Sequence, residues 1–526
     1  MPIYHIPMKE YTSSFFFNPS SLITISLGIV FLIFLYKWSS NIKKNKNFPP
    51  SPPSIPVIGN LHQLGLHPHR TLRDLSRRHG GHDLMLLHLG SVPVLVVSSA
   101  DTAREVMKTH DLAFSDRPKA AAYEKLLYNY RDIASAPYGE YWRQTRSICV
   151  LHLLSTAAVQ SFRGVRDEET KLLMEKIHHS CSSASAVNLS ELFATLTNDV
   201  VCRVALGRKY SGSTSSGGGE SGRTFKELLR EFAELLGGFN IGDYIPMLAW
   251  LRHFNGVEAR MNKVAKEFDE FLEGVVEEHV RHDHAQSRDR NKNIVDILLW
   301  IQKENLLGFP IDRTCIKALI LDMFAAGTDT TFTVLEWAMT ELLRHRKAMN
   351  NLQNEVRTNL GHKTGVTEDD LEKLPYLKAV FKETLRLHSP VPLLVPRAAT
   401  KDVKVKGYDV VAGCWVFINA WAIGRDPATW DEPEQFRPER FLSDGPAAGV
   451  DYRGRDFGLI PFGAGRRGCP GTLFAMAVNE IALANVVHKF DWELPGGARG
   501  EDLDMAETSG VTIHRKFPLM ALPKFV

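Results

Sequence analysis

Residues 461–471, PFGAGRRGCPG, set a single cysteine in a glycine-rich turn, with an arginine two positions before it. A thiolate that binds haem iron needs backbone N–H groups turned toward its sulfur and a close approach to the flat porphyrin, and glycines allow both. Arg467 would lie beside a haem carboxylate in a charge-assisted hydrogen bond. The simpler interpretation is a tight loop that happens to carry a buried cysteine. The longer pattern around Cys469 favours the haem site.

That longer pattern is F-x-x-G-x-R-x-C-x-G, and every position of it is filled. Its members are Phe462, Gly465, Arg467, Cys469 and Gly471. It resembles the signature of the cytochrome P450 family. The resemblance extends from about residue 49 to the C-terminus and implies a mainly α fold with a small β-sheet region. It also implies a haem b whose iron is ligated by the Cys469 thiolate, with Phe462 and Arg467 in contact with the haem.

Residues 319–343 read as a long, mostly apolar helix interrupted by the sequence AAGTDTT at 325–331. Glycine and short polar side chains weaken the helical hydrogen-bond ladder there. A local opening would make room for dioxygen and water. The segment resembles the oxygen-activation motif of the family, which implies that Thr330 donates a hydrogen bond to bound oxygen and that Asp329 relays protons from solvent. A helix kink with satisfied polar groups is the alternative.

Glu383 and Arg386 lie three residues apart on an expected helix, a spacing that is weak evidence by itself. The sequence FRPERF at 436–441 resembles a second arginine-bearing motif of the family. We therefore expect Glu383, Arg386 and Arg440 to form a buried network that fixes the loop leading to Cys469. Its role would be structural, and loss of one member would leave a buried charge without a partner.

Trp142 and Arg146 lie four residues apart on one helix face, so both can reach the same ligand. In isolation such a pair is more often packing plus a surface charge. By resemblance these two residues bind a haem propionate, and Arg397, which ends the sequence PVPLLVPR, matches another propionate arginine.

The composition fits a large enzyme. The chain has 526 residues, of which 44% are hydrophobic, enough to bury a substantial core. The net charge of +3, from 63 basic and 60 acidic residues, is too balanced to indicate a nucleic-acid partner. Six cysteines without a C-x-x-C pair exclude the common zinc spacings and fit a reducing compartment.

The N-terminal region predicts a membrane anchor. Asn18-Pro19 can start a helix, and no charged residue follows until Lys37. We expect a short lumenal tail (1–18), a transmembrane anchor (19–37), a basic and proline-rich hinge (38–60) and a haem-binding catalytic domain (61–526). The lysines after the anchor predict a single-pass protein of the endoplasmic reticulum membrane with a cytosolic catalytic domain. The alternative is a cleaved signal peptide, but this segment lacks an A-x-A-like cleavage site.

Two internal segments stand apart from the motifs. The glycine- and serine-rich residues 211–222 predict a loop between helices. Residues 239–251 are apolar around a proline, so they either pack in the core or dip into the bilayer beside a substrate entrance. We favour the second interpretation.

Periodicity predicts most of the remaining elements. Helices are expected at 224–236, 257–282, 293–304, 347–360 and 476–487. Alternation predicts a hairpin at 83–97 and short strands at 403–405 and 414–418.

Electron donation from an axial thiolate favours O–O cleavage and insertion of oxygen into an unactivated C–H bond. The nucleotide-binding pattern G-x-G-x-x-G after a strand is absent, so electrons must come from a partner. The resemblance implies NADPH–cytochrome P450 reductase, docking near Cys469 on a basic surface. Its candidate residues are Arg143, Arg453, Arg455 and Arg466. Two alternatives are a haem-thiolate dehydratase or isomerase, and a non-catalytic haem electron carrier or sensor.

The substrate class follows from resemblance. Segments 114–118, 136–143, 325–331 and 461–471 resemble the plant microsomal members used in specialised metabolism, whose usual substrates include terpenoids, terpenoid-derived alkaloids and coumarins. Matching the family's substrate-contact regions gives a pocket of Phe324, Ala325, Thr328, Leu394 and Val511. These regions carry few charges, so we expect a small apolar substrate held mainly by shape.

Overall fold

The computed structural model describes residues 23, 26–31, 46–182, 185–210, 225–283, 293–305, 310–361 and 363–526. The chain divides into two units, Met1–Phe48 and Pro49–Val526. In the first unit, residues 26–31 are helical and expose Leu27, Val30 and Phe31. The predicted anchor at 19–37 lies largely outside the described residues, and so does the predicted loop at 211–222.

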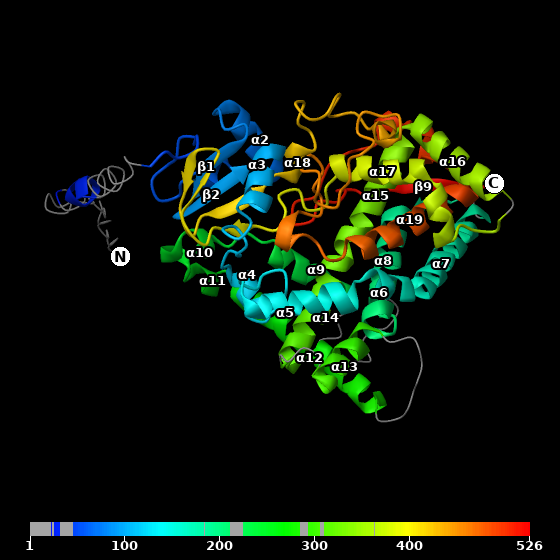
Figure 1. Ribbon diagram of the computed structural model, residues 1–526, viewed down its shortest axis with the longest axis horizontal. Coiled ribbons are helices and arrows are strands. Elements are labelled where there is room, and N and C mark those ends of the chain that lie inside the picture. The colour runs from blue at the N-terminus through cyan, green and yellow to red at the C-terminus, as the bar shows by residue number, and fades with distance from the viewer. Residues whose placement is uncertain are drawn as a thin grey trace, which may run out of the picture. The chain divides into compact units, whose positions relative to one another are not determined.

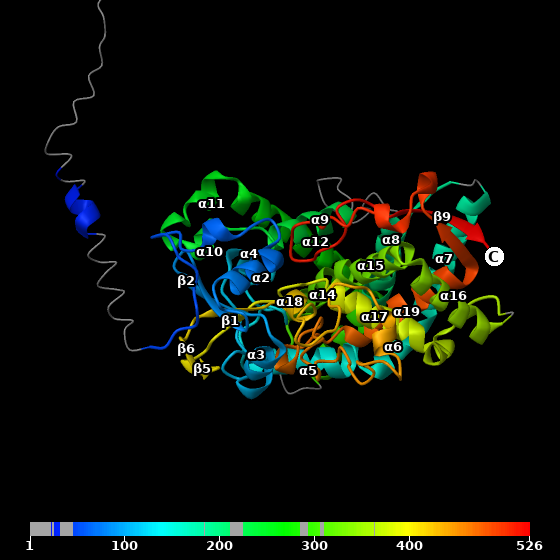
Figure 2. The ribbon, with the colours of Figure 1, turned by 90° about the horizontal axis from the view of Figure 1, so that it is seen from above.

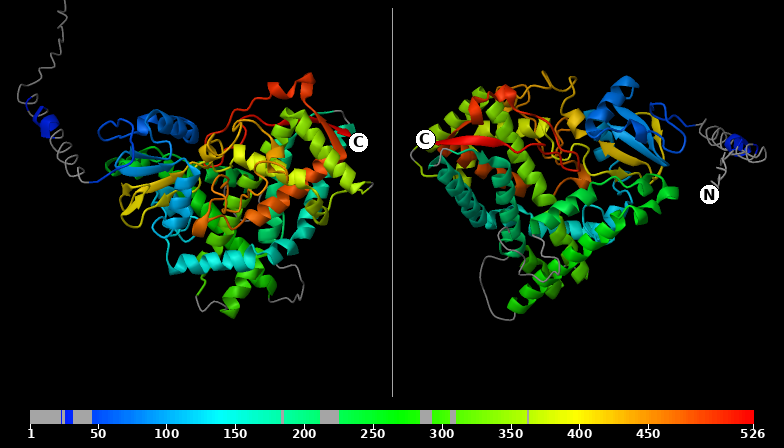
Figure 3. Two further views of the ribbon diagram at one scale, coloured as in Figure 1. Left: turned by 45° about the horizontal axis from the view of Figure 1, so that its top comes forward. Right: turned by 180° about the vertical axis from the view of Figure 1, so that it is seen from behind.

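The second unit carries a four-stranded sheet at the end opposite its C-terminus (Figures 1 and 3). Strands β1 (Leu84–Leu89) and β2 (Val92–Val97) form the predicted antiparallel hairpin. Strand β7 (Trp415–Ile418) runs parallel to β2, and β4 (Arg397–Ala398) pairs antiparallel with β7. The sheet therefore fixes Arg397, which is predicted to bind a haem propionate, on its last strand.

Smaller sheets complete the β structure. Strand β5 (Val403–Val405) pairs with β6 (Tyr408–Val410), while β9 (Met520–Phe525) pairs with both β3 (Val187–Asn188) and β8 (Phe490–Glu493). The predicted strands at 403–405 and 414–418 are thus confirmed, the second starting one residue later than expected.

Helices make up most of the second unit. The long ones are α2 (Pro68–Arg78), α5 (Glu140–Ile148), α7 (Arg163–Ser182), α8 (Leu189–Leu206), α9 (Phe225–Leu236), α12 (Val257–Asp283), α13 (Ile294–Glu304), α14 (Arg313–Gly327), α15 (Asp329–Arg344), α16 (Arg346–Leu360), α17 (Pro375–Leu387) and α19 (Thr472–Lys489). The short α helices are α3 (Ala100–Arg104), α4 (Ala121–Leu126), α6 (Thr156–Ser161), α10 (Ile241–Tyr244), α11 (Leu251–Phe254) and α18 (Ala420–Ile423). All the helices predicted from periodicity are present, and their ends differ from the predicted ones by at most four residues.

Single turns connect these helices. The 3-10 turns are η2 (Leu61–Gln63), η5 (Pro246–Leu248), η6 (Glu368–Lys373), η7 (Pro438–Phe441), η8 (Gly465–Arg467), η9 (Pro495–Gly497) and η10 (Gly500–Asp502), and the π turns are η3 (Glu105–Thr109) and η4 (Cys149–Leu153).

Helices α14 and α15 form the centre of the core. Asp312 caps the start of α14 by accepting a hydrogen bond from the Cys315 N–H, and almost every side chain of α15 is buried. Helix α15 packs against α8, α17 and α19, an arrangement that Figures 1 and 2 both show. The span Arg313–Arg344 is long and apolar enough to cross a membrane, but 56% of its most apolar window is buried inside the protein. It is the core helix of the second unit.

The apolar residues 239–251 lie only partly in the core, because Ile245 is 5% exposed and Tyr244 packs against the buried residues of β1 and β2. They form α10, η5 and the start of α11, and Met247 and Trp250 are exposed. Tyr244 anchors this segment to the β1–β2 turn, because its carbonyl oxygen accepts a hydrogen bond from the Ser91 N–H at 2.9 Å. Gly90 lets the two segments meet, since a Cβ at that position would lie 2.3 Å from the same carbonyl oxygen.

Candidate functional site

One apolar cavity brings together most of the residues that the motifs single out. Its wall is built by α14 and α15, the glycine-rich loop before α19, α5, and the segment before β4. The predicted residues that line it are Trp142, Arg146, Thr330, Leu394, Arg397, Phe462, Arg467 and Cys469. Positions more than 300 residues apart in the sequence therefore face one space.

Glycine conformations shape the loop that carries the cysteine. Gly463 and Gly465 both have a φ of 68°, a left-handed conformation that other residues rarely adopt. A Cβ on Gly465 would lie 2.3 Å from the Met107 carbonyl oxygen, so only glycine fits there. The Cys469 N–H donates to the Phe462 carbonyl oxygen at 2.8 Å, which closes the loop below the cysteine.

Cys469 lines the cavity, and the surface that it exposes faces this space. Burial raises the pKa of the Cys469 thiol, while N–H groups of Gly471 and Thr472 and the charge of Arg146 act in the opposite direction. Of the six cysteines, all in the described part of the chain, this one alone lines the cavity. A thiolate here would meet N–H groups at the start of α19, as the sequence predicts.

The cavity holds a surplus of buried positive charge. Arg467 donates to the carbonyl oxygens of Ser115 at 2.8 Å and Ala136 at 2.6 Å, and its guanidinium stacks over Trp142 at 4.2 Å. Arg397 donates to the Ala464 carbonyl oxygen at 2.8 Å. Burial lowers the pKa of Arg467 to about 10, and the charge of neighbouring Arg397 acts in the same direction. Arg397 also pairs with the buried Asp111 at 3.3 Å, and the guanidinium charge that remains would suit an anion in the cavity.

Arg117 belongs to this cluster, although the motif analysis did not assign it a role. It donates to the carbonyl oxygens of Ala134 at 2.8 Å and Val395 at 2.7 Å, and it lines the same cavity. Burial lowers its pKa, and the charges of Arg467 and Arg397 lower it further. The sequence signal was the FSDRP segment at 114–118, which resembles plant members but does not reveal what the arginine faces.

The junction of α14 and α15 brings Thr330 to the cavity wall. The Thr330 hydroxyl donates to the Ala326 carbonyl oxygen at 2.5 Å, so its oxygen is left to accept a hydrogen bond. Thr328, between the two helices, keeps helical dihedral angles of −81° and −63°. The predicted interruption is therefore a local weakening of the ladder and not a sharp kink. Asp329 begins α15 but is not among the residues that line the cavity.

The three charged residues expected to brace the cysteine loop do meet. Arg386 donates two hydrogen bonds to the Glu383 carboxylate at 2.7 and 2.8 Å, and Arg440 Nε donates to the same group at 3.1 Å. All three side chains are at most 1% exposed. Arg386 also donates to the carbonyl oxygens of Pro433 and Gln435, tying α17 to the segment before η7.

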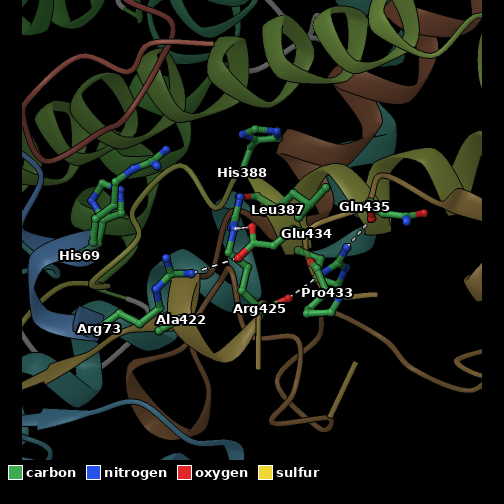
Figure 4. A network of polar contacts seen from close by, with 12 residues as sticks. His69, Arg73, Leu387, His388, Ala422, Arg425, Pro433, Glu434 and Gln435 are labelled. Atoms are coloured by element: carbon green, nitrogen blue, oxygen red, sulfur yellow. Dashed lines mark hydrogen bonds and ion pairs between the residues drawn. The ribbon is translucent and has the colours of Figure 1, made fainter. Parts of the chain in front are cut away.

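A second polar network, which sequence reasoning missed, extends from this brace (Figure 4). Arg425 donates to the Leu387 carbonyl oxygen at the end of α17 and to Glu434 at 3.0 Å, and Arg73 on α2 donates to the same carboxylate at 3.1 Å. Burial lowers the pKa of Arg425 to about 10. The network connects the helical part of the unit to its sheet end.

Four of the five predicted pocket residues lie outside the lining of this cavity. Leu394 lines it, whereas Phe324, Ala325, Thr328 and Val511 do not. Phe324 is buried against Phe225 of α9, with ring centroids 5.2 Å apart. Val511 is 42% exposed and close to α9, since a Cβ on Gly237 would lie 3.0 Å from its Cγ2. A contact of these four with substrate stays a prediction.

The sequence model of the cytochrome P450 family matches residues 49–519. The chain belongs to the cytochrome P450 family. Cytochrome P450 736A117 from Prunus mume is 62% identical to this P450, covering 97% of this chain and 96% of its own. Cytochrome P450 71A6 from Nepeta racemosa is 55% identical, covering 95% and 98%. Norfluorocurarine oxidase from Strychnos is 49% identical, covering 96% and 98%.

A solved structure of a zebrafish cytochrome P450 with progesterone superimposes with a TM-score of 0.74 and 25% identity, covering 88% of this chain and all of its own. The mainly helical P450 fold with small sheets is thus confirmed. This P450 is an oxidoreductase of the monooxygenase type, with a haem whose iron is ligated by a cysteine thiolate. The cavity fits that group, because one cysteine and four guanidinium groups face it and haem carries two carboxylates.

Proposed function

We propose that this P450 uses oxygen and electrons from NADPH to oxidise a small, largely apolar plant specialised metabolite, such as a terpenoid, a terpenoid-derived alkaloid or a coumarin. The observation that carries this proposal is that Thr330 and Cys469 line one cavity whose other walls are mainly apolar. The similarity to a plant protein named norfluorocurarine oxidase supports a specialised metabolite as substrate.

In this proposal the residues of the cavity have separate roles in binding haem. Cys469 ligates the haem iron, and Phe462 lies beside the ligand. The haem carboxylates are held by the buried cationic and indole side chains; these are Trp142, Arg146, Arg397, Arg467 and, in addition to the sequence prediction, Arg117. Bound haem supplies oxygen activation and C–H oxidation.

Two residues at the start of α15, Asp329 and Thr330, would supply protons. Thr330 presents its hydroxyl to the cavity and holds its own proton toward the Ala326 carbonyl oxygen. Asp329, one residue earlier and partly exposed, would pass protons toward it from solvent. Glu383, Arg386 and Arg440 take no part in the chemistry and keep the cysteine loop in place.

We propose that electrons arrive from NADPH–cytochrome P450 reductase at a basic surface near the cysteine loop. Arg143, Arg453 and Arg455 are exposed and could face a negatively charged partner, although Arg453 pairs with Asp451 at 3.5 Å. Arg466 is exposed as well but pairs with Asp111 at 2.7 Å. Charge reversal at Arg143 and Arg455 should lower the rate of reduction by the reductase, and added salt should remove the difference.

We also propose that the protein is a single-pass endoplasmic-reticulum membrane protein with a cytosolic catalytic domain. Within the second unit, Met247, Trp250 and Phe254 expose apolar surface, and Ile55 and Val57 do the same beside the β1–β2 turn. Exposed aromatic and apolar side chains of this kind suit the interface of a bilayer. Residues 239–251 would then dip into the membrane beside a substrate entrance.

The test is product analysis with microsomes that contain this P450 and a reductase, fed a panel of plant terpenoids, alkaloids and coumarins. The proposal predicts a product one oxygen heavier, or a related oxidised product, that requires both NADPH and oxygen. Microsomes carrying Cys469→Ser should form none. Conversion that continues without oxygen or NADPH would instead indicate a dehydratase or isomerase.

A further inference from the structure

The peptide unit of Ile133 links α14 to the proposed haem-binding side chains. Its N–H donates to Asp322 Oδ2 on α14 at 2.8 Å. Its carbonyl oxygen accepts from Trp142 Nε1 at 3.0 Å and from Arg467 Nη1 at 3.3 Å. A carboxyl group on α14 therefore sets the place of a carbonyl oxygen that two haem-cavity side chains share.

The neighbouring residues of this segment hold the same guanidinium groups. The carbonyl oxygen of Ala136 accepts from Arg467 Nη2 at 2.6 Å, and that of Ala134 accepts from Arg117 Nε at 2.8 Å. Both Ile133 and Ala134 line the cavity. If the backbone at 133–136 moved, both arginines would lose acceptors at once.

Asp322 does not act alone, because the carboxyl group of Asp132 lies close enough to raise its pKa. Asp132 and Asp322 are 0% and 7% exposed. Asp132 accepts from the Ser135 N–H at 2.8 Å and from the Ser135 hydroxyl. Two buried carboxyl groups in contact cannot both be ionised, so the pair holds one proton.

The surroundings decide which carboxyl group carries that proton. Asp132 has the two donors of Ser135, and the charges of Arg117 and Arg467 also act on it. The other titratable groups near the pair are the Tyr123 hydroxyl and the Cys149 and Cys315 thiols, which are neutral at ordinary pH. The negative charge therefore belongs on Asp132 and the proton on Asp322.

Backbone strain lies directly before the pair. Tyr128, Asn129 and Tyr130 have φ values of 50°, 54° and 62°, three consecutive non-glycine residues in the left-handed region. That conformation is costly for a residue with a Cβ. Contacts on both sides must hold such a turn, and the buried Asp132 and Asp322 follow it.

We propose that Asp322 is a positioning residue that holds the Ile133 peptide and thereby keeps Arg467 and Trp142 against the haem carboxylates. Asp322 also lines the cavity, but this role acts through the Ile133 peptide and needs no contact between the Asp322 carboxyl group and haem. The inference rests on the proposed role of Arg467 and Trp142 in haem binding.

The test measures how fast the ferric holoenzyme loses haem to excess apomyoglobin. Asp322→Ala leaves the Ile133 N–H without an acceptor and should speed haem loss by about tenfold. Asp322→Asn can still accept from Ile133 and donate to Asp132, so it should keep the parent rate. Glu355→Gln is the matched control, because this carboxylate also accepts backbone N–H bonds, from Tyr376 and Leu377, but lies outside the cavity lining.

The pH dependence separates positioning from general stability. Burial and the neighbouring Asp132 raise the pKa of Asp322, so its contribution is complete at low pH and is lost as pH rises through the raised value. Haem loss from the parent should therefore quicken as pH rises through that raised value, while haem loss from Asp322→Asn should not change with pH. Hydrogen exchange at 133–136 should follow the same trend.

Two results would overturn the inference. One is an Asp322→Ala variant that folds and loses haem at the parent rate with unchanged exchange at 133–136. The other is an Asp322→Asn variant with the parent's pH dependence, which remains measurable if the alanine variant does not fold. A parent protein that binds no haem would instead contradict the proposed function.

Discussion

At the scale of single residues, the hydroxyl group of Thr330 is the one that we expect to take part in oxygen activation. It faces the cavity with its proton directed to the Ala326 carbonyl oxygen. Thr333, one turn later, makes the same kind of bond to the Asp329 carbonyl oxygen at 2.8 Å but does not line the cavity. The two threonines therefore form a matched pair for mutation.

We predict that Thr330→Ala leaves haem content unchanged, lowers the product formed per NADPH and raises peroxide, because the oxygen site loses a hydroxyl. Thr333→Ala should leave this coupling as in the parent. The measurement is product, peroxide and NADPH in one reaction. Equal coupling in the parent and Thr330→Ala would show that another group activates oxygen.

Substrate choice should also depend on single side chains. Leu394 lines the cavity, and its φ of 52° holds it in a strained conformation beside the cysteine loop. We predict that Leu394→Phe changes the position of oxidation or the preferred substrate while the carbon monoxide spectrum stays intact. A hydrophobic pocket discriminates by about 1–3 kcal/mol per methylene, so related skeletons should shift in rank and not vanish.

Val511→Phe tests the pocket that resemblance alone predicts. This residue lies outside the cavity lining, so a changed product profile would mean that substrate reaches past α9. If Leu394→Phe kept the parent's products, the cavity next to Cys469 would not be the substrate site.

At the scale of elements, the brace between α17 and η7 should determine whether the cysteine loop keeps its shape. Arg440→Ala leaves the fully buried Glu383 carboxylate with one partner fewer, and breaking such a pair costs about 3–5 kcal/mol. Arg437→Ala is the control, because this nearby arginine makes only exposed ion pairs with Asp431 and Glu432, worth about 0–1 kcal/mol.

Chemical denaturation with haem absorbance as the readout should separate the two variants. Arg440→Ala should unfold at lower denaturant and lose the haem band first, and Arg437→Ala should follow the parent. Equal denaturation midpoints for the two variants would show that the Glu383–Arg386–Arg440 network does not hold the cysteine loop in place.

The glycine-rich loop offers a second comparison at this scale. Gly465→Ala combines a left-handed φ with a Cβ placed 2.3 Å from the Met107 carbonyl oxygen, whereas Gly413 has a φ of 78° and open space around it. We predict that Gly413→Ala costs only about 1 kcal/mol, while Gly465→Ala prevents haem incorporation. Normal haem content in Gly465→Ala would show that the loop does not need this turn.

Sequence patterns and structure agree best where spacing carries the signal. The pair Trp142 and Arg146 follows from helical periodicity, and the hairpin at 83–97 follows from alternation. The contacts of the Ile133 peptide could not be predicted, because they involve backbone atoms and two of its three partners, Asp322 and Arg467, come from distant segments. No sequence pattern predicts that residues 128–130, none of which is a glycine, adopt the left-handed conformation.

At the scale of the whole molecule, the second unit is one fold built around one cavity. Residues from α5, α15, β4 and the loop before α19 converge there, and the α14 and α15 pair runs through the centre of the core. Four guanidinium groups, three of them buried, and one cysteine face the same space. The central claim is that this cysteine is the haem ligand.

The spectrum of the reduced protein with carbon monoxide tests that claim most directly. A thiolate opposite carbon monoxide shifts the main haem band to about 450 nm, far more than an imidazole does. We predict this band for the parent and its loss, together with turnover, in Cys469→Ser. Cys149→Ser, which changes a buried cysteine outside the cavity lining, should keep the band. A normal band in Cys469→Ser would contradict the account.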